Sequence, residues 1–184
     1  MKFIQTLIPG AYLIHPKFFK DKRGVFIKTF HIDTFKEQNI ECDFKESFYS
    51  YSKKNVIRGM HFQNPPHDHA KLVYVSQGAV LDVLVDLRKG SPAYGKFFSA
   101  ELSSENHQLI YIPQGCAHGY LSTKDNSCVI YMHTTVHVPG ADTGIHFESF
   151  GFNWGVENPI LSDRDKSFKH LSDYESPFIY LEKG

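Results

Sequence analysis

NVIRGMHFQNPPHDHAKLVYV, the stretch from Asn55 to Val75, places an arginine, three histidines and a lysine on two short apolar runs. Val56-Ile57 and residues 72–75 predict buried strands, and residues 64–66 (NPP) can continue neither of them, because proline lacks the N–H that strand pairing requires. The polar residues are therefore expected at strand ends that face a common space. They are Arg58, His61, His67, His69 and Lys71. A lysine beside an arginine and several histidines favours a pocket that stabilises negative charge.

Short strand-like runs separated by turn residues continue along most of the chain. They are predicted at residues 11–15, 24–30, 45–52, 79–87, 96–102, 108–112, 119–122 and 127–137. Residues 17–23 are expected to form a charged loop, 33–38 a helix with Asp33 as its N-cap, and 159–165 a turn with a short final helix. Regular strand spacing without long helical patterns predicts an all-β sandwich or barrel. Neither a repeat nor a linker interrupts the pattern, so residues 1–184 are expected to form one domain.

Composition narrows the classes of function. Twenty Lys and Arg residues balance 20 Asp and Glu residues, so the sequence gives no sign of a nucleic-acid partner. The three cysteines show no metal-binding spacing, which favours a reduced, cytoplasmic protein over a disulfide scaffold. No segment approaches the roughly 20 apolar residues that span a bilayer. We therefore expect a cytoplasmic protein that binds neither nucleic acid nor membrane.

One constellation of residues is typical of a metal site. The pair His67 and His69 and the later His118 in PQGCAHGY resemble the two motifs of metal-binding cupins, a double-stranded β-helix family. The first motif lacks its glutamate, because Val73 and Tyr74 stand where that residue is expected. Three imidazoles can still hold zinc. The missing carboxylate favours the alternative that His67 and His69 are exposed loop residues.

A second constellation is typical of metal-free proton transfer next to a ketone. Such chemistry needs a base with a partner that fixes its tautomer, a cation near the developing enolate, and an acid on the opposite face. His61, Lys71 and Tyr131 supply these types of group, and Asp165 is suited to orient the histidine. Each also has a structural alternative, such as a packed tyrosine, a helix-capping aspartate or a core histidine. Spacing by itself does not bring these distant residues together.

Several ordered motifs resemble one enzyme family. They are DKRGVF (21–26), VIRGMHFQ (56–63), PPHDHAKLV (65–73), VLVDLRKGSPAYGKF (83–97), ELSSENHQLIYIPQGCAHGY (101–120) and PILSDRD (159–165). Together they are similar to the nucleotide-sugar 4-keto-6-deoxyhexose epimerases, typified by dTDP-4-dehydrorhamnose 3,5-epimerase. The resemblance implies a cupin-type jelly roll, a homodimer with exchanged strands, a nucleoside-diphosphate sugar as substrate, and neither a metal nor an organic cofactor. The last implication accounts for the missing cupin glutamate.

The resemblance also implies roles for catalytic residues. His61 in RGMHFQ matches the general base of the family, and Asp165 in PILSDRD matches the aspartate that pairs with it. Lys71 in AKLV matches the lysine that stabilises the enolate at the C4 oxygen. Tyr131 in IYMHTT matches the tyrosine that returns a proton to the opposite face.

Substrate-binding residues are implied in the same way. Arg23 and Arg58 match the arginines that contact the diphosphate, a role suited to guanidinium geometry. Phe26 and Gln63 are expected to line the same cleft, together with the pocket histidine His118.

The chain also departs from the family pattern. Residues 46–49 read Glu-Ser-Phe-Tyr where Gln-Asp-Asn-His is frequent, and this run is expected near the nucleotide, so Glu46 favours an amino-bearing base such as cytosine or guanine. Val136-His137 replaces a later tyrosine pair. These departures leave open a single-carbon (C3 or C5) epimerase of a CDP- or GDP-linked sugar and a ketoisomerase on the same fold. A non-catalytic or metal-binding cupin is the alternative from a different class.

Overall fold

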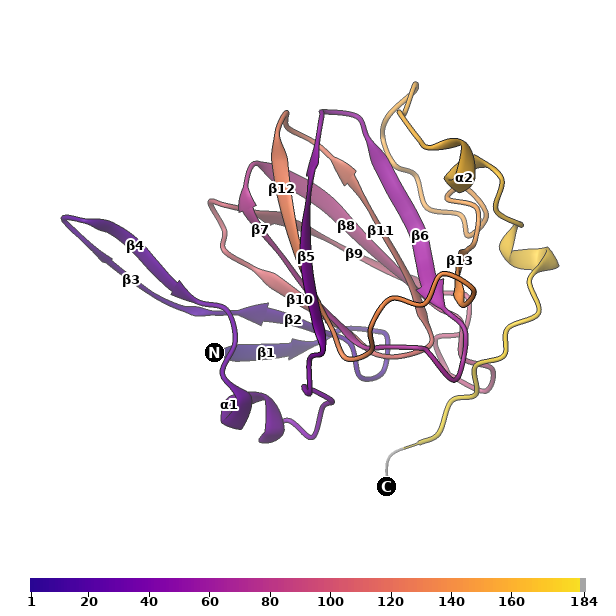
Figure 1. Cartoon of the computed structure of the whole chain (residues 1–184), viewed down its shortest axis with the longest axis horizontal. Coiled ribbons are helices and arrows are strands. Elements are labelled where there is room, and N and C mark those ends of the chain that lie inside the picture. The colour runs from indigo at the N-terminus through magenta and orange to yellow at the C-terminus, as the bar shows by residue number, and fades with distance from the viewer. Residues whose placement is uncertain (183–184) are drawn as a thin grey trace.

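Two antiparallel sheets pack face to face in the computed structural model, which describes residues 1–182 (Figure 1). The six-stranded sheet has the order β1 (Lys2–Gln5), β2 (Tyr12–His15), β10 (Leu109–Ile112), β7 (Lys71–Gln77), β12 (Ser127–His133) and β5 (Glu46–Ser52). The five-stranded sheet has the order β13 (Asp142–Gly144), β6 (Ile57–Gln63), β11 (Cys116–Ser122), β8 (Ala79–Asp86) and β9 (Phe97–Ser103). The predicted all-β jelly roll is confirmed.

The strand β8 shows why alternation decides which side chains reach the interior. Val80 and Leu84 belong to the core cluster between the sheets, which also holds Val73 of the facing sheet. Val83 belongs to a second cluster, which is covered by the segment from 145 onward. Because successive side chains point to opposite faces, Asp82 lies on the same inner face as Val80 and Leu84. A fully buried carboxylate is thereby placed between the sheets.

The helices differ in detail from the prediction. α1 spans Ile32–Lys36, and its N-cap is His31 rather than Asp33, because the chain is still extended at His31 and turns helical directly after it. Asp33 therefore lies in the first turn. The predicted final helix is confirmed as α2 (Asp163–Lys166), whose N-cap Ser162 accepts a hydrogen bond from the Asp165 amide at 3.1 Å. A 3₁₀ turn, η1, follows at Leu171–Asp173.

Residues 17–23 do not form the predicted charged loop. Instead β3 (Lys17–Asp21) pairs with β4 (Gly24–Lys28) in a hairpin that projects away from the two sheets (Figure 1). Phe19 and Phe26 face each other across this hairpin and are 66% and 61% exposed. A two-stranded hairpin is marginally stable by itself in water. Its exposed aromatic residues are therefore a feature that the rest of this chain does not explain.

Strand limits differ in several further places. β12 ends at His133 rather than at residue 137, and β11 begins at Cys116 rather than at residue 119. The strands β1 and β13 were not predicted. Among the described residues, none of the helices has the length and hydropathy of a membrane span.

Candidate active site

A cavity of about 390 Å³ opens between the two sheets and gathers most of the predicted site residues. Its lining takes side chains from β5, β7 and β12 of one sheet and from β6, β11 and β13 of the other. The predicted residues in this lining are Glu46, Arg58, His61, Gln63, Lys71, His118 and Tyr131. Asp165 lies behind it, bonded to His61. Arg23 and Phe26 belong to the projecting hairpin and do not reach this cavity within the chain.

His61 and Asp165 form a dyad across 104 positions of sequence. The ring Nε2–H of His61 donates to Asp165 Oδ1 at 2.8 Å, and the Gly59 amide donates to the other carboxylate oxygen at 3.1 Å. Burial by itself would raise the pKa of Asp165, but these bonds outweigh it and hold that pKa below its ordinary value. A carboxylate that accepts from Nε2–H leaves the lone pair of the neutral ring on Nδ1. The geometry suits His61 to act as a base.

Lys71 begins β7 beside this dyad. Its side chain is 5% exposed, and its Nζ donates to the backbone carbonyl of His61 at 3.0 Å. Burial lowers the pKa of Lys71 to about 8, although the carboxylates of Asp142 and Asp82 oppose the shift. At neutral pH the cavity therefore holds one buried ammonium next to the candidate base.

Tyr131 of β12 lies across the cavity from the second sheet. Burial, reinforced by Tyr120 and Asp82, raises the pKa of Tyr131 well above its ordinary value. Its ring stacks on Phe48 of β5, with centroids 4.8 Å apart and planes 16° apart. The phenol stays protonated at neutral pH and is held in a fixed plane, as a proton donor requires.

His118 of β11 has a carboxylate partner of its own. Its Nε2–H donates to Asp82 Oδ2 at 2.8 Å, and both residues are buried. Burial lowers the pKa of His118 even though Asp82 opposes the shift. The spacing of Asp82 in β8 was visible in the sequence, but only the register between β8 and β11 brings it to His118.

Polar residues at the cavity wall tie the surrounding loops together. Gln63 accepts from the Val138 amide at 2.6 Å and donates to the carbonyls of His67 at 2.7 Å and Val136 at 3.2 Å. Glu46 Oε2 accepts from the His137 amide at 2.7 Å, so this carboxylate holds the loop after β12.

Arg58 is exposed, and its Nε donates to the Ser52 hydroxyl at 3.0 Å. Its Nη2 also donates to the Tyr51 carbonyl at 3.3 Å, so these bonds hold the exposed guanidinium at the rim of the cavity.

The metal alternative is not supported by the positions of its histidines. Among the described residues, no group of three or more ligating side chains is arranged to hold an ion. His69 and His118 line the cavity and His67 does not. The prediction that His69 is an exposed loop residue is also wrong, because His69 is only 8% exposed. Its ring contacts Gln63 at 3.2 Å and stacks on His133.

Several lining residues were missed at the sequence level. They are Phe48, Ser50, Phe62, His133, His137 and Asp142. Phe48 and His133 lie on strands whose register with Tyr131 and Lys71 decides their place. Strand alternation gives the face on which each residue lies, but not its neighbour across the cavity.

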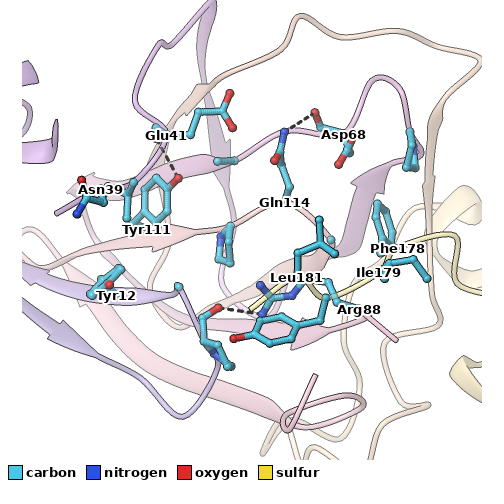
Figure 2. A pocket seen from close by; sticks show the side chains of 18 of the residues that line it. Tyr12, Asn39, Glu41, Asp68, Arg88, Tyr111, Gln114, Phe178, Ile179 and Leu181 are labelled. Atoms are coloured by element: carbon cyan, nitrogen blue, oxygen red, sulfur yellow. Dashed lines mark hydrogen bonds between the residues drawn. The ribbon is translucent and has the colours of Figure 1, made fainter. Parts of the chain in front are cut away.

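A second cavity, of about 690 Å³, lies beyond the loop that carries His69 (Figure 2). Asp68 and Ala70 line this second cavity, whereas His69 and Lys71 line the first. Two of its polar side chains are bonded to backbone carbonyls. Arg88 donates to the Pro9 carbonyl at 2.9 Å, and the Tyr111 hydroxyl donates to the Glu41 carbonyl at 2.9 Å (Figure 2). The paired acid and base groups lie in the smaller cavity.

Comparison with known proteins agrees with this geometry. The family model described as dTDP-4-dehydrorhamnose 3,5-epimerase matches residues 5–173. A protein of that name from Methanothermobacter thermautotrophicus is 38% identical over 98% of both chains. A dTDP-4-dehydrorhamnose 3-epimerase from Streptomyces niveus is 33% identical over 90% of this chain and 82% of the relative.

A solved structure has the same fold. The Legionella pneumophila dTDP-6-deoxy-D-glucose-3,5-epimerase, in complex with dTDP-4-keto-L-rhamnose, superposes with a TM-score of 0.93 at 32% identity, covering 98% of this chain and 99% of that one. Since the family model and the relatives span almost the whole chain, this protein belongs to the dTDP-4-dehydrorhamnose 3,5-epimerase family.

Proposed function

We propose that this protein is an epimerase that inverts C3, C5 or both in a nucleoside-diphosphate 4-keto-6-deoxyhexose, as a step of deoxysugar biosynthesis. The single observation that carries the assignment of roles is the arrangement of His61. Its ring is bonded to Asp165 at 2.8 Å, and its own carbonyl accepts from the Lys71 ammonium at 3.0 Å. A base and a cation are therefore adjacent, as removal of a proton next to a carbonyl requires.

The chemistry follows from the 4-keto group, which acidifies the hydrogens on C3 and C5. His61 takes one of these protons on Nδ1, and the electron pair of the C–H bond moves to the C4 oxygen as an enolate. The Lys71 ammonium stabilises that oxygen in a water-poor site. The Tyr131 phenol then gives its proton to the opposite face of the carbon, and the C4 carbonyl forms again. Proton exchange with solvent restores His61 and Tyr131, and no net oxidation occurs.

The position of Arg58 supports a role for this residue in binding the diphosphate. It is exposed at the cavity rim, and a guanidinium suits two phosphate oxygens at once. Glu46 remains a prediction for the nucleobase, and its bond to the His137 amide leaves the second carboxylate oxygen for a ligand. Gln63 supports the wall behind the sugar by holding the loop residues 136–138.

Arg23 and Phe26 fit the proposal only through a second copy of the chain. The hairpin that carries them projects away from the sheets (Figure 1), and Phe18, Phe19, Val25 and Phe26 are each 44–66% exposed. We infer that the protein is a homodimer in which each hairpin covers the partner's cavity. Arg23 then adds a second guanidinium, and Phe26 an apolar cover.

Relatives within the family differ in the number of carbons named as inverted. The Streptomyces niveus relative is named as a 3-epimerase, and others are named as 3,5-epimerases. In this chain His137 stands in place of a tyrosine and is held by Asp142 at 3.3 Å. This observation supports single-carbon inversion as the alternative candidate.

The experiment is proton NMR in D2O with dTDP-, CDP- and GDP-linked 4-keto-6-deoxyhexoses. Deuterium at C3 and C5 marks a double epimerase, and deuterium at one carbon marks the alternative. His61→Ala is expected to slow exchange at least about 100-fold, the usual contribution of a general base. His67→Ala, which changes a neighbouring histidine outside the cavity, is the matched control. Wild-type exchange rates in His61→Ala would contradict the assignment of the base.

A further inference from the structure

Two histidines of the catalytic cavity have no part in the proposed mechanism and, among the described residues, no carboxylate partner. His61 and His118 are each bonded to an aspartate, and His137 contacts Asp142. His69 and His133 remain. Their rings stack on each other with centroids 4.1 Å apart and planes 18° apart, and both residues line the cavity. The reaction steps leave this stacked pair unexplained.

Each ring of the pair carries an unsatisfied polar atom. His69 and His133 are 8% and 7% exposed, and among residues 1–182 neither Nε2 has a hydrogen-bond partner. A buried donor or acceptor without a partner is costly, so native proteins keep few of them. Two such atoms in stacked residues that line a binding cavity point to a ligand group that satisfies them.

The surrounding bonds determine which kind of group that is. The Gln63 amide nitrogen lies 3.2 Å from His69 Nδ1 and also donates to the carbonyls of His67 and Val136. Burial, with the charge of Lys71, lowers the pKa of His69 to about 3, so the ring is neutral at pH 7. A neutral imidazole has one donor and one acceptor nitrogen. A hydroxyl both donates and accepts, so it pairs with His69 Nε2 in either tautomer.

The pair also has a definite place relative to the reacting carbonyl. His133 is the cross-strand partner of Lys71, and His69 precedes Lys71 by two residues. In the mechanism above, Lys71 binds the C4 oxygen. The carbons next to C4 are C3, which carries a hydroxyl, and C5, which carries a methyl group. A polar ring nitrogen beside Lys71 suits the hydroxyl rather than the methyl group.

We propose that His69, supported by the stacked ring of His133, is a specificity-determining residue whose Nε2 binds the C3 hydroxyl of the sugar. This inference rests on the proposed function and adds to it a requirement for the substrate. A 4-keto-6-deoxyhexose with its C3 hydroxyl is a good substrate, and its 3-deoxy counterpart is a poor one. Sites built to bind a hydroxyl reject analogues that lack it, because their own polar groups are then left unpaired.

The test compares two sugars as substrates of four proteins. The sugars are a nucleoside-diphosphate 4-keto-6-deoxyhexose and its 3-deoxy counterpart, and the readout is kcat/KM for deuterium uptake from D2O. The proteins are wild type, His69→Leu, His69→Gln and the control His67→Leu, which alters the same loop outside the cavity. Thermal unfolding establishes that each variant folds.

The expected result is selective. His69→Leu lowers kcat/KM for the hydroxylated sugar by about tenfold or more and leaves the 3-deoxy sugar within about twofold, because only the first sugar loses a bond. His69→Gln, which keeps an N–H donor, restores most of the loss, and His67→Leu changes neither value. Equal losses on both sugars, or none, would overturn the inference while the epimerase assignment stands. Absence of deuterium uptake by the wild type with every sugar would overturn the proposed function and this inference with it.

Discussion

Lys71 shows how burial of a single residue sets the conditions under which the site works. Its pKa is lowered to about 8 because the charged ammonium loses hydration, whereas the pKa of Tyr131 is raised well above its ordinary value. The two shifts have opposite consequences in alkaline solution. Lys71 loses its charge as the pH rises through about 8, and Tyr131 keeps its proton.

The first prediction at this scale concerns the alkaline limb of the pH profile. We expect kcat/KM for deuterium uptake to fall as pH rises above about 8, since the fraction of protonated Lys71 declines there. Lys71→Met is expected to slow the reaction about 100-fold and to abolish this limb, whereas the control Lys45→Met, which changes an exposed lysine, leaves both unchanged. A wild-type profile that stays flat to pH 10 would show that the charge of Lys71 is not needed.

Individual residues of the site differ in how far the sequence could predict them. The pairing of His61 with Asp165 followed from family motifs, because no periodicity relates residues so far apart. His69 was placed in an exposed loop, since two histidines separated by one residue after a proline turn look solvated. Its ring contacts Gln63 of β6 and stacks on His133 of β12. Burial of a loop residue is a tertiary property, and local pattern does not contain it.

At the scale of elements, the sequence pattern predicts most strands correctly, but it predicts a loop where the structure has the first strand of the hairpin. The runs at 79–87 and 108–112 have buried, β-branched residues, and β8 and β10 lie there. Residues 17–21 read KFFKD, where charged residues surround two adjacent phenylalanines, so neither alternation nor a buried run appears. The strand exists because it pairs with β4, not because one of its faces is buried in this chain.

The close approach of β6 and β11 gives a prediction about Gly119. The register of the two strands shifts between His118 and Tyr120, and a Cβ at Gly119 would lie 2.8 Å from the Arg58 carbonyl and 2.9 Å from the Gly59 Cα. Backbone atoms cannot turn away as side chains can. Gly119→Ala is therefore expected to destabilise the fold by about 1–3 kcal/mol and to displace His61, lowering activity.

Urea unfolding and deuterium uptake measure both effects. The matched control is Gly140→Ala, because a Cβ there meets no atom within 4 Å, and it should change stability by no more than about 0.5 kcal/mol. Equal stability and activity of the two variants would show that β6 can shift at little cost.

At the scale of the whole molecule, the hairpin β3–β4 is the feature that one chain leaves incomplete. Its apolar side chains are exposed on an element that two strands alone barely stabilise. Within residues 1–182, the Arg23 side chain at its turn is bonded only to the neighbouring Asp21, at 2.6 Å, and is 84% exposed. A second copy, related by a twofold axis, would receive this hairpin and give its own in return.

Mixing two inactive variants tests whether each hairpin completes the cavity of the partner or the cavity of its own chain. His61→Ala lacks the base but keeps a normal hairpin, and a variant with Arg23→Ala and Phe26→Ala keeps the base but loses both hairpin contacts. If hairpins are exchanged, each mixed dimer contains one site with both features intact, so unfolding and refolding the two together should restore about one quarter of wild-type activity. If the hairpin serves its own chain, every site in the mixture carries a defect and no activity returns. Refolding each variant alone is the control, and size-exclusion chromatography with light scattering establishes that dimers have formed in all three samples.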